Sequence, residues 1–408
     1  MIAKKRAQDF PGSIVYFTEA DPSAQVLYNI TPEEFSAKMK LWLLLADHAV
    51  LSVGHMLESN ITFDWLTANS QAVAELAQDE AVVPSLREDR DGFRDFVVQA
   101  PEQEDSPSVL VGQRDVLLGR ASVLSDVFST AVCWPPTGES RWFRDSMAAD
   151  LARRDSPLRR RLVGVRTAVV DRLAGEIASR EFLKREELTR IIRKHCPERE
   201  RLLRRYGDVF YHMAGAVFKD AVPVLHPGAA ALFRQKVADA VRSTATPSGQ
   251  QGELWRDILD AWGLTFASLQ RLPLSEVVQI RHDSLGVKLR RTWGTLLRRA
   301  GFSKVVRQNI AEFDSARIDL IRLLHTEVGA QRRRYSTVQK VRSALEVGSW
   351  VTAGLGYLVG LCLTSDPVVS LVSGALGLAV GKPVLDGVGK RLPKTELVVV
   401  AARIVGRG

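Results

Sequence analysis

Three short runs of apolar and β-branched residues constrain the fold of the first hundred residues most strongly. The runs are residues 13–18, 49–53 and 81–86. Each is bounded by turn-forming residues, and the segments between them are long enough for helical crossovers. Thr31 and Pro32 predict a helix start, with Thr31 as the cap and a helix that continues to Ala46. We therefore expect a small mixed α/β unit of two or three layers at the N-terminus.

The rest of the chain has a helical pattern. The 408 residues are 46% hydrophobic and 25% charged, values typical of globular proteins, which excludes a disordered or low-complexity chain. Polar segments at residues 100–107 and 243–252 predict domain boundaries. The expected fold is α+β and predominantly helical. Its parts are a mixed α/β unit at 1–100, a basic helical region at 108–242, a region of long antiparallel helices at 253–345, and a glycine-rich hairpin and tail at 346–408.

Two helical stripes of apolar residues occupy the third of these regions. The first follows Ser275 and predicts one helix running to Gly301. The second runs from Val306 to Val328 and follows at once. Two long helices joined near Gly301 predict an antiparallel helical hairpin.

The most unusual segment is a pair of uncharged, glycine-rich stretches near the C-terminus. Residues 347–365 and 367–381 contain no charged side chain, and Asp366 separates them. As helices they would extend about 28 Å and about 22 Å, so the first approaches the thickness of a bilayer core and the second falls short. Small residues four apart allow helices to approach closely in lipid. The candidate membrane-hairpin residues are Gly354, Gly356, Gly360, Gly374, Gly377 and Gly381.

Basic residues flank this segment on both sides. Arg342 precedes it, and Lys382, Lys390 and Arg391 follow it, which would keep both ends on the cytoplasmic side of a membrane. A buried helical hairpin in a water-soluble domain explains the glycines equally well. A third alternative is an anchor that is packed away in one state and inserted in another.

The positive charge of the chain is concentrated in one window. The formal net charge is +9, and residues 153–205 contain 17 basic and 8 acidic side chains, so this window accounts for the whole excess. Such a segment can attract nucleic-acid phosphates or anionic lipid headgroups, although charged runs more often form the solvated face of a helix. The candidate contacts to an anionic partner are Arg190, Arg193, Lys194, Arg201, Arg204 and Arg205.

The usual linear motifs of enzymes do not occur. The three cysteines are far apart, the glycine patterns miss both common nucleotide-binding signatures, and no zinc-protease or esterase motif occurs. We therefore assign no catalytic residue, metal, cofactor or small-molecule substrate. One group of acid and imidazole side chains, His48 and His55 near Asp47 and Glu58, could supply a general base, but a hydrogen-bonded structural pair is the simpler interpretation.

Charge and hydropathy together lead to an expected function. We expect a non-enzymatic protein that associates with, or inserts into, a membrane through its glycine-rich hairpin. The first alternative is a helical scaffold or nucleic-acid-binding module using residues 153–205, and the second is an enzyme without linear motifs. A protein partner or homo-oligomer fits as well. Asp9, Pro11 and Gly12 stand where a signal peptide would be apolar, so we expect a cytoplasmic location, at the inner face of the membrane in the leading hypothesis.

Overall fold

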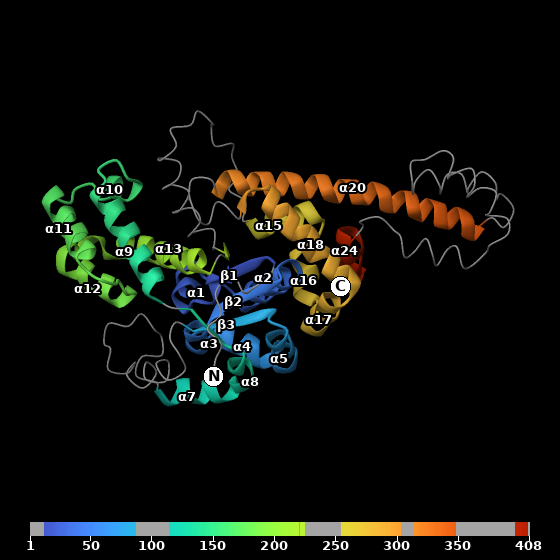
Figure 1. The fold of residues 1–408 in the computed structure, drawn as a ribbon, viewed down its shortest axis with the longest axis horizontal. Coiled ribbons are helices and arrows are strands. Elements are labelled where there is room, and N and C mark those ends of the chain that lie inside the picture. The colour runs from blue at the N-terminus through green and yellow to red at the C-terminus, as the bar shows by residue number, and fades with distance from the viewer. Residues whose placement is uncertain are drawn as a thin grey trace.

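The computed structural model describes seven stretches of the chain. These are residues 12–86, 114–134, 136–219, 221–224, 254–302, 313–347 and 396–406. A parallel sheet lies at the centre, a lobe of helices lies on one side of it, and a C-terminal helical body lies on the other (Figure 1). The protein is α+β and predominantly helical, as the sequence predicts.

Five parallel strands form the sheet in the order β4-β3-β2-β1-β5. They are β1 (Ile14–Phe17), β2 (His48–Ser52), β3 (Val82–Leu86), β4 (Val132–Cys133) and β5 (Val222–Val224). The first three confirm the runs predicted from the sequence. The last two are short strands from the region predicted to be helical. Residues after position 100 therefore also contribute strands to the sheet. Two or three residues carry too little periodicity to be distinguished from a loop.

The connections between the first four strands are helical. They contain α1 (Pro22–Tyr28), α2 (Pro32–Leu45), α3 (Val53–Glu58), α4 (Asn60–Ala68), α5 (Ser70–Gln78), α7 (Arg114–Val123) and α8 (Ser125–Ser129). The Thr31 side chain accepts a hydrogen bond from the backbone N–H of Glu34 at the start of α2, which confirms the predicted cap. These helices share one large hydrophobic core with one face of the sheet. Val15 and Phe17 of β1 pack into that core.

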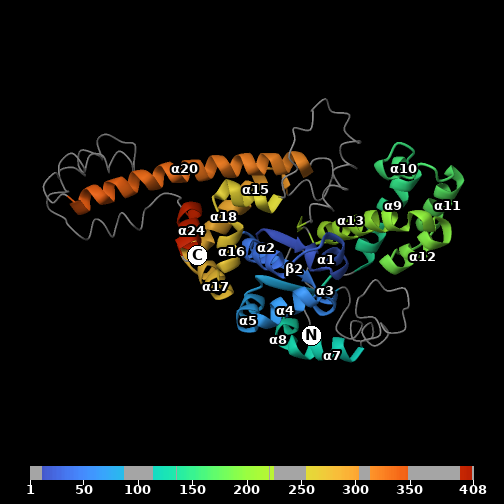
Figure 2. The same cartoon turned by 180° about the vertical axis from the view of Figure 1, so that it is seen from behind.

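The connection from β4 to β5 is a separate lobe of helices. Its members are α9 (Pro136–Ala152), α10 (Pro157–Arg161), α11 (Thr167–Ala178), α12 (Arg185–His195) and α13 (Glu200–Phe218). The lobe has a hydrophobic core of its own, which includes Phe143, Leu173 and Ile192. Figure 2 shows the lobe from behind, projecting from the sheet. The end of α13 returns to the sheet, where Ala216 packs with Ile14 and Tyr16 on the face opposite the large core.

The strand order reverses direction between β1 and β5. β1 to β4 follow one another toward one edge, whereas β5 pairs with β1 on its other side. Right-handed crossovers then require the last connection to return on the opposite face, as the end of α13 does. This reversal is a topological switch point, where open parallel sheets bind their ligands at the carboxyl ends of the strands.

The C-terminal body corrects one prediction. It contains α15 (Leu254–Trp262), α16 (Phe266–Arg271), α17 (Leu274–His282), α18 (Ser284–Arg299), α20 (Phe313–Val347) and α24 (Glu396–Gly406). The single helix expected from Ser275 to Gly301 is two helices. Asp283 ends the first and caps the second, because its carboxylate accepts hydrogen bonds from the backbone N–H groups of Leu285 and Gly286.

The second apolar stripe is confirmed in part. Leu320, Leu324 and Val328 of α20 are buried as predicted. Residues 303–312, which would complete the predicted hairpin, lie outside the described residues, as do the two predicted linkers and all six candidate membrane-hairpin glycines. Within the described ranges, no helix combines the length and the apolar composition that crossing a bilayer requires.

Candidate active site at the carboxyl edge of the sheet

A group of buried polar side chains lies at the switch point. Thr18 and Asp21 follow the carboxyl end of β1, His55 follows that of β2, and His212 lies on α13, the helix that precedes β5. The Thr18 hydroxyl donates a hydrogen bond to the carbonyl oxygen of Val224 and thereby ties the carboxyl ends of β1 and β5 together. The fold thus gathers at one edge residues that are up to about two hundred positions apart in sequence.

Asp21 is the centre of the group and is 1% exposed. Its Oδ1 accepts a hydrogen bond of 2.8 Å from the backbone N–H of Ser23, as the cap of α1. Its Oδ2 lies 2.7 Å from a guanidinium nitrogen of Arg185, 3.2 Å from Nε2 of His212 and 3.7 Å from Nε2 of His55. One carboxylate oxygen therefore faces one permanent cation and two titratable imidazoles.

Asp21 and Arg185 both remain charged although the protein surrounds them. Burial raises the pKa of Asp21, but Arg185 and the two histidines outweigh it and hold that pKa well below its usual range. Burial lowers the pKa of Arg185, but Asp208 and Asp21 outweigh it and raise that pKa. At neutral pH the edge therefore contains a buried carboxylate and a partly buried guanidinium.

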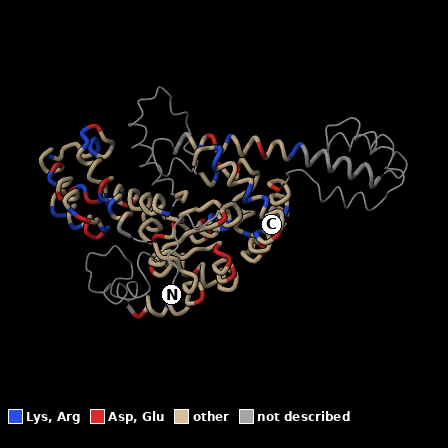
Figure 3. The backbone as a smooth tube through the Cα atoms, viewed as in Figure 1, with Lys and Arg blue, Asp and Glu red and all other residues tan. Residues whose placement is uncertain are grey.

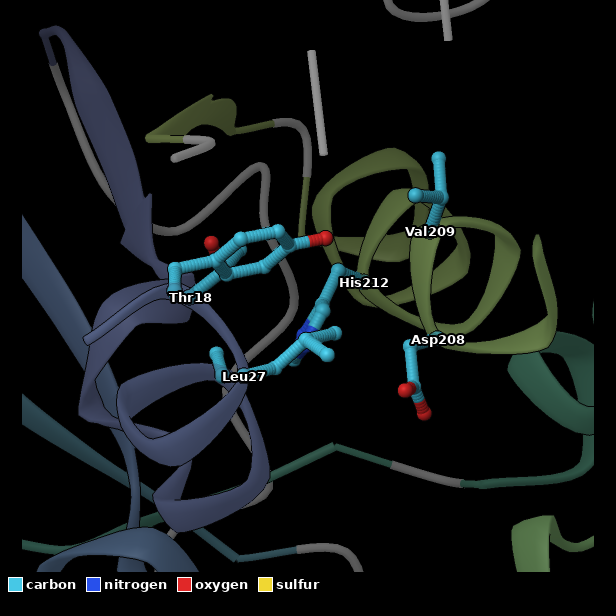
Figure 4. Close-up of a pocket in the computed structure, with 7 residues that line it drawn as sticks. Thr18, Leu27, Asp208, Val209 and His212 are labelled. Atoms are coloured by element: carbon cyan, nitrogen blue, oxygen red, sulfur yellow. The ribbon is translucent and has the colours of Figure 1, made fainter. Parts of the chain in front are cut away.

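His212 connects this charged group to a small pocket. The pocket lies between α1 and α13 and has room for about one water molecule; it is lined by Thr18, Ala24, Leu27, Tyr28, Asp208, Val209 and His212. Figure 4 shows the His212 ring extending from α13 toward Leu27 of α1. His212 is 3% exposed, yet neither of its ring nitrogens has an aligned hydrogen bond within the described residues. Its Nε2 nevertheless lies 3.2 Å from Oδ2 of Asp21, close enough for a charge interaction.

A phenol shares the pocket with the imidazole. Burial raises the pKa of Tyr28, and the neighbouring Asp208 carboxylate raises it further. The Tyr28 hydroxyl therefore keeps its proton at neutral pH and can act as a hydrogen-bond donor.

A second network of buried polar side chains contacts the backbone next to Asp21. Lys38 of α2 is fully buried and pairs with Glu19 at 2.9 Å. The Gln25 amide donates to the Glu19 carbonyl oxygen at 3.0 Å and to the Thr62 hydroxyl at 3.1 Å, and the Ser59 hydroxyl donates to the Gln25 carbonyl oxygen at 2.5 Å. Satisfied buried networks of this kind fix side-chain positions. The backbone that carries Asp21 is thereby held in one conformation.

The structure separates the two histidines that the sequence grouped together. His48 begins β2 at the amino edge of the sheet, where its Nδ1 lies 2.7 Å from the carbonyl oxygen of Glu80. His55 follows the opposite end of the same strand and lies beside Asp21. The sequence therefore identified one member of the site, His55, with the wrong neighbours.

The basic candidates lie on the helical lobe, among acidic residues (Figure 3). Arg193 and Arg204 both contact Glu200, at 3.1 Å and 3.4 Å, and Lys194 contacts Glu176 at 2.9 Å. Arg190 and Arg201 are exposed, and Arg205 is half-buried. Their contact with an anionic partner stays a prediction.

Asp21, Arg185, Asp208 and His212 were not identified from the sequence. One signal was available, because polar residues directly after a buried strand are typical of ligand sites in α/β proteins. Nothing in the sequence indicates that α12 and α13 return to that strand.

In the part of the chain that the structure describes, no group of acidic, histidine or cysteine side chains has the geometry of a metal site. Comparison with family models, curated proteins and solved structures gives no match.

Proposed function

We propose that this protein is an enzyme that acts on a small polar substrate at the carboxyl edge of the sheet, by general acid–base chemistry. His212 is the proton-transfer group, and the nearby Asp21 carboxylate stabilises positive charge that develops on its ring. The observation that carries the proposal is a buried imidazole, His212, whose Nε2 lies 3.2 Å from a buried carboxylate and whose ring lines a pocket at the switch point.

The chemistry follows from the position of the carboxylate. When one nitrogen of His212 takes a proton from a substrate hydroxyl or from water, the ring becomes an imidazolium. The Asp21 carboxylate at 3.2 Å stabilises that charge. The same nitrogen then returns the proton to the leaving group, so the site ends the cycle as it began.

The pocket has room for about one water molecule, so only the reacting group of a substrate, and not the whole substrate, could enter it. Asp208 supplies acceptor oxygens and Tyr28 a donor hydroxyl, whereas Ala24, Leu27 and Val209 are apolar. Among the described residues that line the pocket there is no lysine or arginine. These groups suit a neutral substrate with hydroxyl or amine groups better than a phosphate.

A substrate screen tests the proposal. The full chain is incubated with panels of nucleosides, glycosides and carboxylic esters, and products are identified by mass spectrometry. We expect turnover of one class, a loss of at least about 100-fold in kcat in His212→Ala, and no change in the matched control His282→Ala. His282 is half-exposed and pairs with Asp79 far from the site. Full activity in His212→Ala would contradict the proposal.

We propose, as a second function, attachment to the inner face of a membrane through residues 347–381. The observation in its favour concerns the two helices that flank this segment. α20 packs against α15 and α18, and α24 packs against α18 and α20, so the helices before and after the segment belong to one body. A hairpin that enters and leaves a membrane on the same side is compatible with this arrangement.

Flotation with anionic liposomes tests this second function. The intact chain is compared with a variant in which residues 348–390 are replaced by a Gly/Ser linker of equal length, which retains α20 and α24. We expect the intact chain to float and the linker variant to stay at the bottom of the gradient. Equal behaviour of the two proteins would contradict membrane attachment by this segment.

A further inference from the structure

The outer side of α18 carries a row of basic side chains. Lys288, Arg291, Arg298 and Arg299 are all exposed, and the helix contains no aspartate or glutamate. At 3.6 residues per turn, these four positions fall within an arc of about 100° around the helix and extend over about 16 Å along its axis. They therefore form one continuous surface, the basic face of α18.

The side chains of the basic face have no acidic partner. Among the residues that the structure describes, none of the four lies within ion-pair distance of a carboxylate, and Arg298 donates instead to the Thr295 hydroxyl at 3.2 Å. On the lobe, by contrast, Glu176 and Glu200 each contact basic side chains. The basic face of α18 thus presents positive charge that no described acid neutralises.

The opposite side of α18 is committed to the protein core. Leu289, Trp293 and Leu296 are at most 2% exposed, and the helix packs against α2, α17, α20 and α24. A helix that binds at a membrane surface inserts an apolar face among the lipids. α18 has no apolar face left for insertion, whereas binding to the phosphates of a nucleic acid requires only charge and hydrogen-bond donors.

The composition of the face favours a duplex over a single strand. Proteins that bind single strands stack unpaired bases on exposed aromatic rings. Trp293 is the one aromatic residue of α18, and it is fully buried. Three of the four basic residues are arginines, whose planar guanidinium can donate two hydrogen bonds to one phosphate.

We propose that the basic face of α18 binds the phosphate backbone of double-stranded nucleic acid. The contact is electrostatic and independent of base sequence, because no side chain of the face is suited to base stacking and phosphates carry no sequence information. α18 lies near the amino edge of the sheet, where Arg290 lies 3.4 Å from Asp47, just before β2. The candidate active site lies at the carboxyl edge, so the proposal does not depend on the proposed enzymatic function.

Titration of a DNA duplex tests the proposal. The full chain is added to a fluorescent duplex of about 20 base pairs and mixed sequence, and anisotropy gives Kd at salt concentrations from about 50 to 200 mM. The test variant is Lys288→Gln/Arg291→Gln/Arg299→Gln. We expect its Kd to rise by at least about tenfold. The slope of log Kd against log salt concentration should fall by about 2–3, since each phosphate contact contributes about 0.9.

Two further variants serve as controls. Arg154→Gln/Arg166→Gln/Arg201→Gln removes the same charge from exposed positions of the lobe and should change Kd by less than about threefold. Arg291→Lys/Arg299→Lys keeps the charge of the face and should bind within about threefold of the native chain. Circular dichroism checks that each variant is folded.

Four results would overturn the proposal. They are no binding of the duplex by the native chain at about 50 mM salt, an equal loss of affinity in the lobe variant, an equal loss in the charge-conserving variant, and tighter binding of a single strand of the same length.

Anionic liposomes test the competing partner. The Gly/Ser linker variant, in which residues 348–390 are replaced, is assayed for flotation with and without the three glutamine substitutions in α18. We expect neither protein to float. Flotation that the three substitutions abolish, without a matching effect on the DNA duplex, would assign the basic face to lipid headgroups and reject nucleic acid.

Discussion

Arginine side chains in this protein often satisfy backbone carbonyls at helix ends. Arg281 donates to the carbonyl oxygens of Leu43, Ala46 and Asp47 at the end of α2, and Arg144 donates to those of Arg180 and Glu181 after α11. Carbonyls at the end of a helix have no partner within the helix and need an external donor. The planar guanidinium supplies several donors at once. Part of the basic excess of the chain therefore has a structural role.

Glu176 of the lobe provides a prediction at the scale of one residue. It lies 2.5 Å from Nε2 of His195, 2.9 Å from Nζ of Lys194 and 3.1 Å from a guanidinium nitrogen of Arg180. The hydrogen bonds from His195 and Lys194 lower its pKa from 4.5 to about 2. Because the folded-state pKa is the lower one, the stabilisation is complete above the unfolded pKa and is lost as pH falls from about 4.5 to 2.

Glu176→Gln should remove the part of the free energy of unfolding that depends on the ionised Glu176 carboxylate. We expect the difference in unfolding free energy between the native protein and Glu176→Gln to be constant above pH 5 and to shrink steadily toward pH 2. Urea unfolding at a series of pH values measures it. Glu181→Gln, at an exposed position, is the matched control and should show no such trend. A difference that stays constant down to pH 2 would contradict the assignment.

Among the elements, the junction of α17 and α18 shows how a local contact breaks a regular pattern. The apolar stripe continues across it, but the Asp283 cap redirects the chain and Gly286 allows the first turn of α18 to approach the end of α17. A Cβ atom on Gly286 would lie 1.8 Å from the carbonyl oxygen of Ile280. Gly294, later in the same helix, has only an ordinary contact with Arg298 at 3.7 Å.

The two glycines of α18 should respond to alanine in opposite directions. Gly286→Ala should lower the free energy of unfolding by about 2–4 kcal/mol, because the backbone of Ile280 must move. Gly294→Ala should raise it by up to about 1 kcal/mol, because alanine favours the helix and finds space. Chemical denaturation of both variants measures the effect. A stabilised Gly286→Ala would show that the junction does not require this close approach.

At the scale of the whole molecule, the C-terminal helix closes the helical body. Leu397, Val400 and Ile404 of α24 are at most 1% exposed. The Leu397 carbonyl oxygen accepts a hydrogen bond of 2.7 Å from the Trp262 indole, and Arg403 pairs with Glu276 at 2.7 Å. A helix that lies beyond the glycine-rich segment is thus part of the same core as α15, α17 and α18.

Truncation after Glu346 should therefore destabilise the body itself. Loss of the three buried aliphatic side chains of α24 should cost about 5 kcal/mol or more, at about 1.5–3 kcal/mol each. Thermal unfolding of the truncated chain and of the Gly/Ser linker variant measures the difference. We expect only the truncated chain to lose stability. Equal stability of the two proteins would contradict the role of α24.

The sequence by itself determined the elements whose signals are local. The three β-branched runs, the Thr31 cap of α2 and the buried stripe of α20 were predictable because periodicity and capping act within a few residues. The helix break at Asp283 was missed, since an aspartate within an apolar stripe shows no cap until the backbone turns. The glycine-rich hairpin stays a prediction, because it lies outside the described residues.

The tertiary structure alone decided where the candidate active site lies. Asp21, Arg185 and His212 come together because β5 pairs with β1 after a lobe of five helices, and strand pairing at that sequence separation leaves no local trace. The sequence could show that His55 carries an imidazole near a strand end. Only the order of the strands in the sheet places it beside the Asp21 carboxylate, because that order is fixed by non-local packing and by crossover handedness.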